Sequence, residues 1–125
     1  MSKLLKEIKS SLQAIELISE LKTSARFCFG KKFIGFKGHF PNKPILPGVC
    51  KIRAALLVLD ERKHKNARLT EIILAKFFTP VTINQELIFN LEEHPKNSVE
   101  STVTVKISSA DKKIAELQLR VDILD

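Results

Sequence analysis

Residues 36–50 read FKGHFPNKPILPGVC, and this stretch holds three of the five prolines and two of the four glycines of the chain. Proline fixes a backbone torsion angle, so a loop with several prolines loses less entropy when it is ordered. The stretch is therefore predicted to be a stiff loop, and it contains one histidine, His39. Imidazole titrates near neutral pH, which makes a histidine in a rigid loop a candidate general base.

The segment after this loop is predicted to be one long helix. Val49 to Lys63 reads VCKIRAALLVLDERK, which is rich in Ala and Leu and contains neither Gly nor Pro. This composition favours a helix over a strand. The middle of the segment is apolar on nearly every side, so we expect the helix to be buried on most of its surface.

Most of the remaining chain predicts strands. Between residues 21 and 29 the side chains alternate, with Leu21, Thr23, Ala25, Phe27 and Phe29 expected on the inner face. Four further strands are expected in series, over residues 68–78, 85–93, 98–108 and 112–124. The short turns between them favour an antiparallel sheet. A sheet that curls around the helix would bury it, and its open edges and uncovered face favour a dimer.

The first residues have the spacing of an amphipathic helix, with apolar positions at Leu4, Leu5, Ile8, Leu12 and Ile15. Residues 15–21 fit either this helix or the strand that follows. At 125 residues the whole chain, 1–125, is predicted to be one domain, in which residues 1–20 are a helical or extended lead-in.

Two blocks of the sequence resemble a known family. Residues 38–49, GHFPNKPILPGV, are similar to the signature of the hotdog-fold 3-hydroxyacyl-[acyl carrier protein] dehydratases. Residues 75–87, AKFFTPVTINQEL, are similar to a second block of that family. The resemblance covers about residues 21–124. It implies an α+β hotdog fold, in which an antiparallel sheet wraps around one long central helix.

The resemblance also implies a function in fatty-acid, lipid or polyketide-type synthesis. Such proteins are homodimers or larger assemblies of dimers. A thioester arrives on the phosphopantetheine arm of an acidic acyl carrier protein, or on coenzyme A, and enters a tunnel between two subunits. The family's base corresponds to His39, and its thioester oxygen is bound by the amide at Gly48 or Val49. A helix N-terminus suits such an oxygen because it carries free N–H groups and partial positive charge. No metal or further cofactor is implied.

The sequence departs from the family at one position. The dehydratases carry a Glu or Asp five residues after the Gly of Pro-Gly-Val, and here that position is Arg53. Arginine stays protonated in proteins and cannot cycle as an acid. Asp60 lies seven residues, or about 10.5 Å, beyond Arg53 along the helix. Glu71 is expected on another strand.

Three functions remain open after this departure. The protein could turn over acyl thioesters with His39 alone, while Arg53 binds a charged or phosphate group. It could instead be a non-catalytic subunit that binds acyl chains or the carrier protein, as a homodimer or paired with an active homologue. It could also be a thioesterase, because hotdog folds host that reaction and a fold does not decide between them.

Positive charge is concentrated in the first half of the chain. Residues 1–63 carry 13 Lys and Arg against 5 Asp and Glu, and no acidic residue lies between Glu20 and Asp60. A field of one sign attracts an acidic partner. The residues expected to bind the carrier protein are Lys31, Lys32, Lys37 and Lys43.

The same region suggests a rival function in another class. Five phenylalanines, at positions 27, 29, 33, 36 and 40, alternate with Lys31, Lys32 and Lys37. Basic residues among aromatic ones can form a platform on which nucleic acid bases stack. The alternation places Phe27 and Phe29 on the same face as Leu21, which favours a core role for these rings.

Cysteine content and hydropathy set further expectations. Two cysteines, Cys28 and Cys50, cannot form a disulfide framework or a four-ligand zinc site, so we expect them to act as small buried apolar residues. The longest fully apolar run, residues 54–59, is far shorter than a membrane span. The first 17 residues interrupt their apolar positions with Lys and Glu, unlike a signal peptide, so a cytoplasmic protein is expected.

Overall fold

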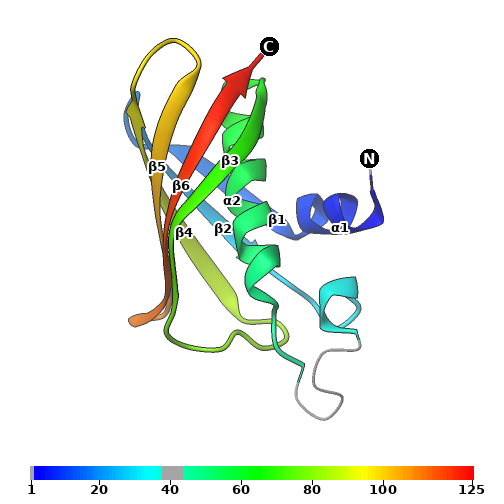
Figure 1. Ribbon diagram of the computed structural model, residues 1–125. Helices are drawn as coiled ribbons and strands as arrows, with labels where there is room; N and C mark the ends of the chain where they lie inside the picture. Colours follow the sequence, from blue (N-terminus) through cyan, green and yellow to red (C-terminus); the bar gives the residue numbers. More distant parts are fainter. Residues whose placement is uncertain (1, 38–43) are drawn as a thin grey trace.

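A six-stranded antiparallel sheet curls around the long helix α2 (Gly48–Lys63), which lies along its concave face (Figure 1). This computed structural model describes residues 2–37 and 44–125. The strands are β1 (Leu12–Leu17), β2 (Lys22–Cys28), β3 (Asn66–Phe77), β4 (Glu86–Pro95), β5 (Glu100–Ser109) and β6 (Lys112–Leu124). Their order in the sheet is β1-β2-β4-β5-β6-β3. The predicted α+β hotdog architecture is therefore confirmed.

The core lies between α2 and the concave face of the sheet. On β2 and β4 every second side chain is buried, including Phe27 and Phe89, whose ring centroids lie 4.8 Å apart. Val58 and Leu59 of α2 are fully or almost fully buried. Burial of such side chains is worth about 1.5–3 kcal/mol each, so the contact between helix and sheet dominates the stability of the fold. The prediction that α2 is buried on most sides is confirmed.

The N-terminal segment differs from the prediction. Helix α1 (Lys3–Ser11) ends early, and Ile15 lies in strand β1, where it pairs with Ala25 of β2. The N–H of Ile18 donates to the carbonyl of Lys22 at 3.0 Å, which closes a hairpin between the two strands. Leu21 lies in this turn and is exposed, so its expected place on the inner face is wrong. Pairing with β2 therefore prevails over the helical spacing of the sequence.

The order of the strands in the sheet departs from their order in the chain at β3. β3 pairs with β6 at one edge of the sheet, and β4 pairs with β2 and β5 in its interior. The connection from β3 to β4 passes below the start of α2, where the N–H of Leu46 donates to the carbonyl of Val81 at 2.8 Å. The four expected strands do follow one another in an antiparallel sheet, but the connection between β3 and β4 is not a short turn, because it carries the chain from the edge to the middle of the sheet.

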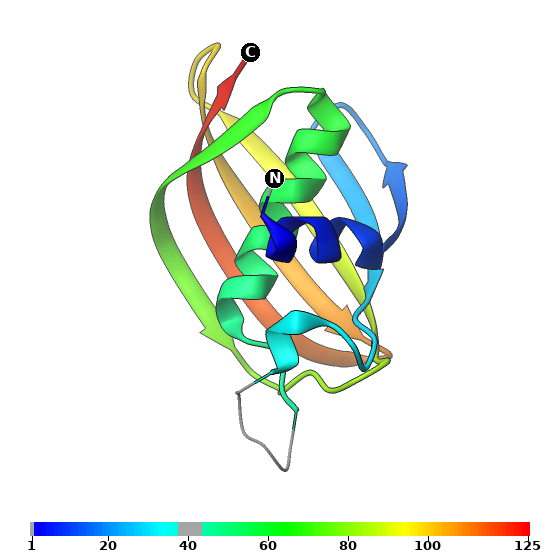
Figure 2. The ribbon, with the colours of Figure 1, turned by 90° about the vertical axis from the view of Figure 1, so that its right-hand side faces the viewer.

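Helix α1 crosses the side of α2 that the sheet leaves open (Figure 2). Ile8 of α1 is completely buried, and Lys9 forms an ion pair with Glu61 of α2 at 3.1 Å. Glu7 accepts a hydrogen bond of 2.7 Å from the N–H of Ile34 in the short helix η1 (Ile34–Phe36). The lead-in segment thus covers the core and fixes the chain just before the proline-rich loop.

Candidate active site at the start of the central helix

Helix α2 begins with backbone donors that have no hydrogen-bond partner among the described residues. Its N-cap residue, Pro47, is extended, and no side chain from the described part of the protein caps the helix. The N–H of Cys50 donates to the carbonyl of Pro47 at 3.1 Å. The N–H groups of Gly48 and Val49 come earlier in the helix and have no intrahelical acceptor, so they can bind an anionic oxygen. Val49 is exposed, as a residue that contacts a ligand or a second subunit would be.

The two sequence blocks that resemble the dehydratases meet at this point. Leu46, from the first block, is hydrogen-bonded to Val81, from the second. The ring of Phe77 lies so close to Gly48 that a β-carbon there would come within 2.8 Å of the ring. The two blocks therefore form one structural unit, although 25 residues of helix and strand separate them.

A cavity of about 420 Å³ opens between these segments. Its walls are mostly apolar and come from the residues before α2 and from the end of β3, among them Ile45, Leu46, Phe77, Phe78 and Pro80. Gly48 and Lys51 of α2 also line it. Apolar walls around a few polar groups are typical of a small-molecule site. The free N–H groups at the helix start thus lie beside a space that suits an acyl chain.

Lys51 is the functional candidate that the sequence reasoning missed. It lies one helical turn after Gly48 and is only 3% exposed, and its Nζ is 5.0 Å from the centroid of the Phe77 ring. Burial lowers the pKa of the Lys51 ammonium from its ordinary value of 10.5. Its sequence signal was its position, a single lysine in the first turn of an otherwise apolar segment, but the direction of its side chain depends on where Phe77 packs.

The other residues of the predicted site are distributed unevenly. Arg53 is exposed on α2. Lys31, Lys32 and Lys37 are exposed on both sides of η1, just before the proline-rich loop. His39 and Lys43 lie outside the described residues, so the predictions for them are carried forward as proposals.

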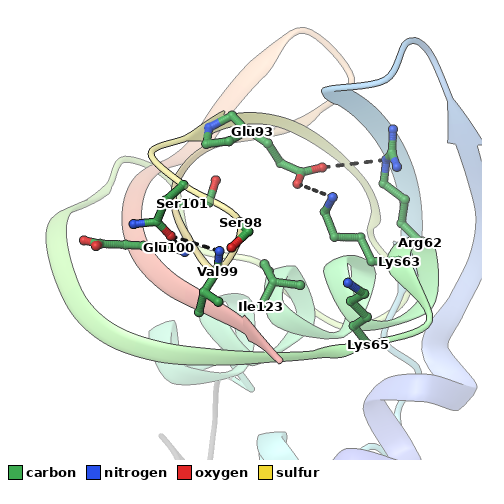
Figure 3. Close-up of a pocket in the computed structure, with 11 residues that line it drawn as sticks. Arg62, Lys63, Lys65, Glu93, Ser98, Val99, Glu100, Ser101 and Ile123 are labelled. Carbon is green, nitrogen blue, oxygen red and sulfur yellow. Dashed lines mark hydrogen bonds and ion pairs between the residues drawn. The ribbon is translucent and has the colours of Figure 1, made fainter. Parts of the chain in front are cut away.

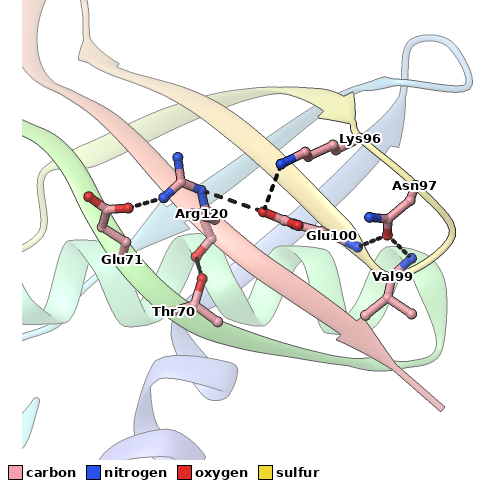
Figure 4. A network of polar contacts seen from close by, with 7 residues as sticks. All are labelled: Thr70, Glu71, Lys96, Asn97, Val99, Glu100 and Arg120. Atoms are coloured by element: carbon pink, nitrogen blue, oxygen red, sulfur yellow. Dashed lines mark hydrogen bonds and ion pairs between the residues drawn. The ribbon is translucent and has the colours of Figure 1, made fainter.

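Neither nearby carboxylate replaces the family's acid at this site. Asp60 accepts a hydrogen bond of 2.7 Å from the N–H of Ala67, near the far end of α2, and burial raises the pKa of its carboxyl. Glu71 forms an ion pair with Arg120 on the outer face of the sheet (Figure 4). Arg120 also lies 3.7 Å from Glu100. Both candidate acids are thus held by groups away from the cavity.

Four of the five phenylalanines of the hypothetical nucleic-acid platform belong to the core, and the fifth, Phe40, lies outside the described residues. Phe27 and Phe29 stack at 5.7 Å, and Phe33 and Phe36 meet edge to face at 5.8 Å. All four rings are buried. Since their faces are covered by protein, they cannot serve as a platform on which bases stack.

The two cysteines are apolar packing groups to different degrees. Cys50 is buried, which raises the pKa of its thiol and makes it a poor nucleophile. Cys28 is half-buried on β2. The prediction of a small buried residue holds fully for Cys50 and in part for Cys28.

A second cavity, of about 370 Å³, lies at the opposite end of α2 (Figure 3). Glu93 of β4 is buried there, with one carboxylate oxygen 2.9 Å from Lys63 Nζ and the other 3.8 Å from Arg62 Nε. The guanidinium of Arg62 also donates to Thr23 Oγ1 at 2.6 Å and to the carbonyl of Ser19 at 2.7 Å. This cluster ties the last turn of the helix to β4 and to the β1–β2 hairpin, which is a structural task.

Fold and site together define a hotdog protein of the dehydratase type. Residues 16–118 match the sequence model of the ApeI-like family, described as ApeI dehydratase. Since this match spans most of the chain, the protein belongs to the ApeI dehydratase family. None of the helices in residues 2–37 and 44–125 has the length and apolar character needed to cross a membrane.

One sequence relative and two solved structures are similar to this chain. The chain is 32% identical over 103 residues to a 3-hydroxyacyl-[acyl-carrier-protein] dehydratase FabZ of Sulfurovum sp. (strain NBC37-1), which covers 72% of this chain and 69% of that relative. A chain of the dehydratase heterocomplex ApeI:P from Xenorhabdus doucetiae has the same fold, with a TM-score of 0.77, 17% identity and coverage of 89% and 96%. A hypothetical thioesterase with coenzyme A from Streptococcus pneumoniae TIGR4 also shares it, with a TM-score of 0.71, 6% identity and coverage of 96% and 93%.

Proposed function

We propose that this protein dehydrates a (3R)-hydroxyacyl thioester presented by an acidic acyl carrier protein, in fatty-acid, lipid or polyketide-type synthesis. The observation that carries the proposal is the joining of free N–H groups at Gly48 and Val49 to an apolar cavity that Phe77 helps to line. The amides suit the thioester oxygen, and the cavity suits the acyl chain. The family membership of residues 16–118 supports the same reaction class.

The proposed chemistry begins at the α-carbon of the thioester. His39 removes an α-proton as general base, and negative charge develops on the thioester oxygen. The N–H groups of Gly48 and Val49 stabilise that charge, with help from the dipole of α2. Arg53 is exposed on α2 and binds a charged or phosphate group of the substrate. No metal or redox cofactor is proposed, and the arm of the carrier protein delivers the substrate.

The working unit is proposed to be a dimer, formed through the free edge of β3. This strand pairs only with β6 among the described residues, so the donors and acceptors of its outer edge are available to another strand. Ile72, Ile73, Phe77 and Phe78 are exposed at or beside this edge. A second subunit placed here would cover these side chains and close the cavity beside Phe77, which would then become a tunnel.

The test is a dehydration assay with a 3-hydroxyacyl thioester linked to a carrier protein. We expect turnover by the wild type, loss of at least about a hundredfold in His39→Ala, and a change of substrate affinity in Arg53→Glu. Turnover that survives His39→Ala would overturn the role of the base. A wild type that releases free thiol instead of the unsaturated thioester would identify a thioesterase.

A second candidate function is a non-catalytic subunit that pairs with an active homologue. Arg53 favours it, because a guanidinium occupies the position of the family's acid and neither Asp60 nor Glu71 replaces it. The heterocomplex of the related ApeI:P dehydratase offers a precedent for unlike subunits. Activity that appears only in Arg53→Glu, or only after an active homologue is added, would select this function.

A further inference from the structure

We propose that Lys51 is the acid of this site, and that its ammonium gives the proton to the hydroxyl that leaves the β-carbon of the substrate. Lys51 would thereby perform the task that a carboxylic acid at position 53 performs in the dehydratases. The assignment rests on the dehydration proposed above. It adds to that proposal a catalytic residue that neither the sequence motif nor the family resemblance contains.

The position of Lys51 places its ammonium beside the proposed thioester site. Gly48 and Lys51 contact the same ring, that of Phe77, and both line the same cavity. In a 3-hydroxyacyl thioester the hydroxyl is only a few bonds from the carbonyl oxygen. A substrate with this oxygen at the start of α2 would therefore hold its hydroxyl within reach of a flexible lysine side chain one turn further on.

The surroundings of Lys51 contain no counter-ion for it. Within residues 2–37 and 44–125, no carboxylate forms an ion pair with Lys51, although the structure contains ten ion pairs elsewhere. Among the described residues, the ring of Phe77 is the one group seen to stabilise this ammonium. An ammonium largely removed from water without a counter-ion is costly, and such costs are concentrated at functional sites. If position 51 were needed only for packing, Met or Leu would suit it better than Lys.

Few titratable groups of the described residues lie near Lys51. Cys50, its neighbour on α2, has a buried neutral thiol, and Lys113 of β6 lies 5.6 Å from the centroid of the Phe78 ring. Burial lowers the pKa of the Lys51 ammonium, which makes it a stronger acid than an exposed lysine. Arg53 cannot take this role, because its guanidinium stays protonated.

The step balances without any further reactant. The base takes a proton from the α-carbon, and the electron pair of that C–H bond becomes the new carbon–carbon double bond. The bond between the β-carbon and oxygen breaks, and the leaving oxygen takes a proton from Lys51. The products are water and the unsaturated thioester, together with a neutral Lys51 amine. The protonated base returns its proton to this amine through solvent, which restores both groups.

The experiment compares Lys51→Met, Lys51→Arg and the control Lys106→Met in full-length protein. Lys106 is an exposed lysine on β5. Two rates are measured with a 3-hydroxyacyl thioester of pantetheine: loss of water, and exchange of the α-proton with heavy water. We expect Lys51→Met to dehydrate the substrate at least about a hundredfold more slowly than the wild type, and to exchange the α-proton at an unchanged rate. Lys51→Arg should dehydrate as slowly as Lys51→Met, and Lys106→Met should show both rates of the wild type.

The outcomes separate this assignment from the proposed dehydration. Dehydration by Lys51→Met within about threefold of the wild type would overturn the role of Lys51 and leave the dehydration standing. Full rescue by Lys51→Arg would also overturn it, because a permanent charge would then suffice. If the wild type catalysed neither dehydration nor α-proton exchange, the proposed dehydration itself would be overturned, and the role of Lys51 with it.

Discussion

The ring of Phe77 lies against the α-carbon of Gly48, so that a β-carbon at position 48 would approach the ring tip to 2.8 Å. Real β-carbons do not tolerate this distance, and Phe77 is 47% exposed, so its ring has room to move away. The glycine therefore lets the ring lie across the start of α2, where it also contacts Lys51. Gly48 and Phe77 thus form one wall of the cavity at the candidate site.

Gly48→Ala should damage the site more than the fold. The new methyl group displaces the ring of Phe77 and so reshapes the cavity, which we expect to lower turnover at least about tenfold. The free energy of unfolding should change by less than about 1 kcal/mol, because alanine favours the helix and offsets part of the strain. Turnover and urea unfolding measure the two effects. Gly30→Ala is the matched control, since its β-carbon meets only Asn84 at an ordinary 3.6 Å.

If Gly48→Ala lowered the free energy of unfolding by clearly more than about 1 kcal/mol while it also lowered turnover, Phe77 would be unable to move. The role of Gly48 would then be structural. Turnover unchanged in this variant would show that the cavity beside Phe77 is not where the substrate binds.

The sequence predicted the elements of this fold better than their neighbours. The apolar run of α2 and the alternation in residues 98–108 are local signals, so the helix and strand β5 lie where we expected them within one or two residues. The pairing of β3 with β6 joins segments that are far apart in the chain, and no local pattern encodes it. Strand β1 was missed because its apolar residues also fit the period of a helix.

The site was predicted in part for the same reason. The sequence located the start of α2 at Gly48 and Val49, because any helix start presents free backbone groups, and the role of these two residues stays a prediction. The burial of Lys51 depends on Phe77, which is 26 residues further along the chain and reaches α2 only through the curl of β3. A lysine in that part of the sequence resembles any other member of the basic window until its packing is known.

Lys51→Met should stabilise the protein, and the gain should depend on pH. The pKa of Lys51 is lower in the folded than in the unfolded chain, so between these two values the unfolded state binds more protons. The stability of the wild type therefore rises with pH in this window, which ends near 10.5. At pH 7 the variant should be more stable by about 1 kcal/mol, and the gap should narrow as the pH rises.

Urea unfolding at several pH values measures this gap, with Lys106→Met as the control for loss of an exposed lysine. A stability difference that does not change between pH 7 and pH 10 would contradict a buried ammonium with a lowered pKa.

Glu93 and Glu71 form ion pairs that should differ in energy. Glu93 is 2% exposed and binds Lys63 and Arg62 at the end of α2, whereas Glu71 pairs with Arg120 at the surface. Loss of one partner from a buried pair leaves the remaining charge uncompensated. We expect Glu93→Gln to cost about 2 kcal/mol of unfolding free energy, and Glu71→Gln less than about 1 kcal/mol.

Equilibrium unfolding in urea distinguishes the two pairs when it is measured at two salt concentrations, on the order of ten millimolar and about 0.5 M. Salt should weaken the effect of Glu71→Gln and leave that of Glu93→Gln almost unchanged. Equal costs for the two variants would mean that the cluster at the end of α2 does not fix the helix to β4.

The exposed lysines on both sides of η1 should bind the carrier protein and leave the chemistry unaffected. Lys31, Lys32 and Lys37 belong to a window without acidic residues, and an acidic partner would be steered toward it. Reversal of all three to Glu should raise KM for the carrier-linked substrate about tenfold or more at low salt, with kcat little changed. The same variant should be normal with the free pantetheine thioester, which lacks the acidic protein.

Salt provides the second test of this surface. Exposed charges are screened beyond about 10 Å at 0.1 M salt, so the difference in KM between the wild type and the triple variant should shrink steeply as salt is added. Lys106→Glu on β5 is the matched control, because it reverses an exposed lysine outside the window. A KM that rises equally for the control, or equally for the pantetheine substrate, would mean that the acidic partner does not dock on the lysines beside η1.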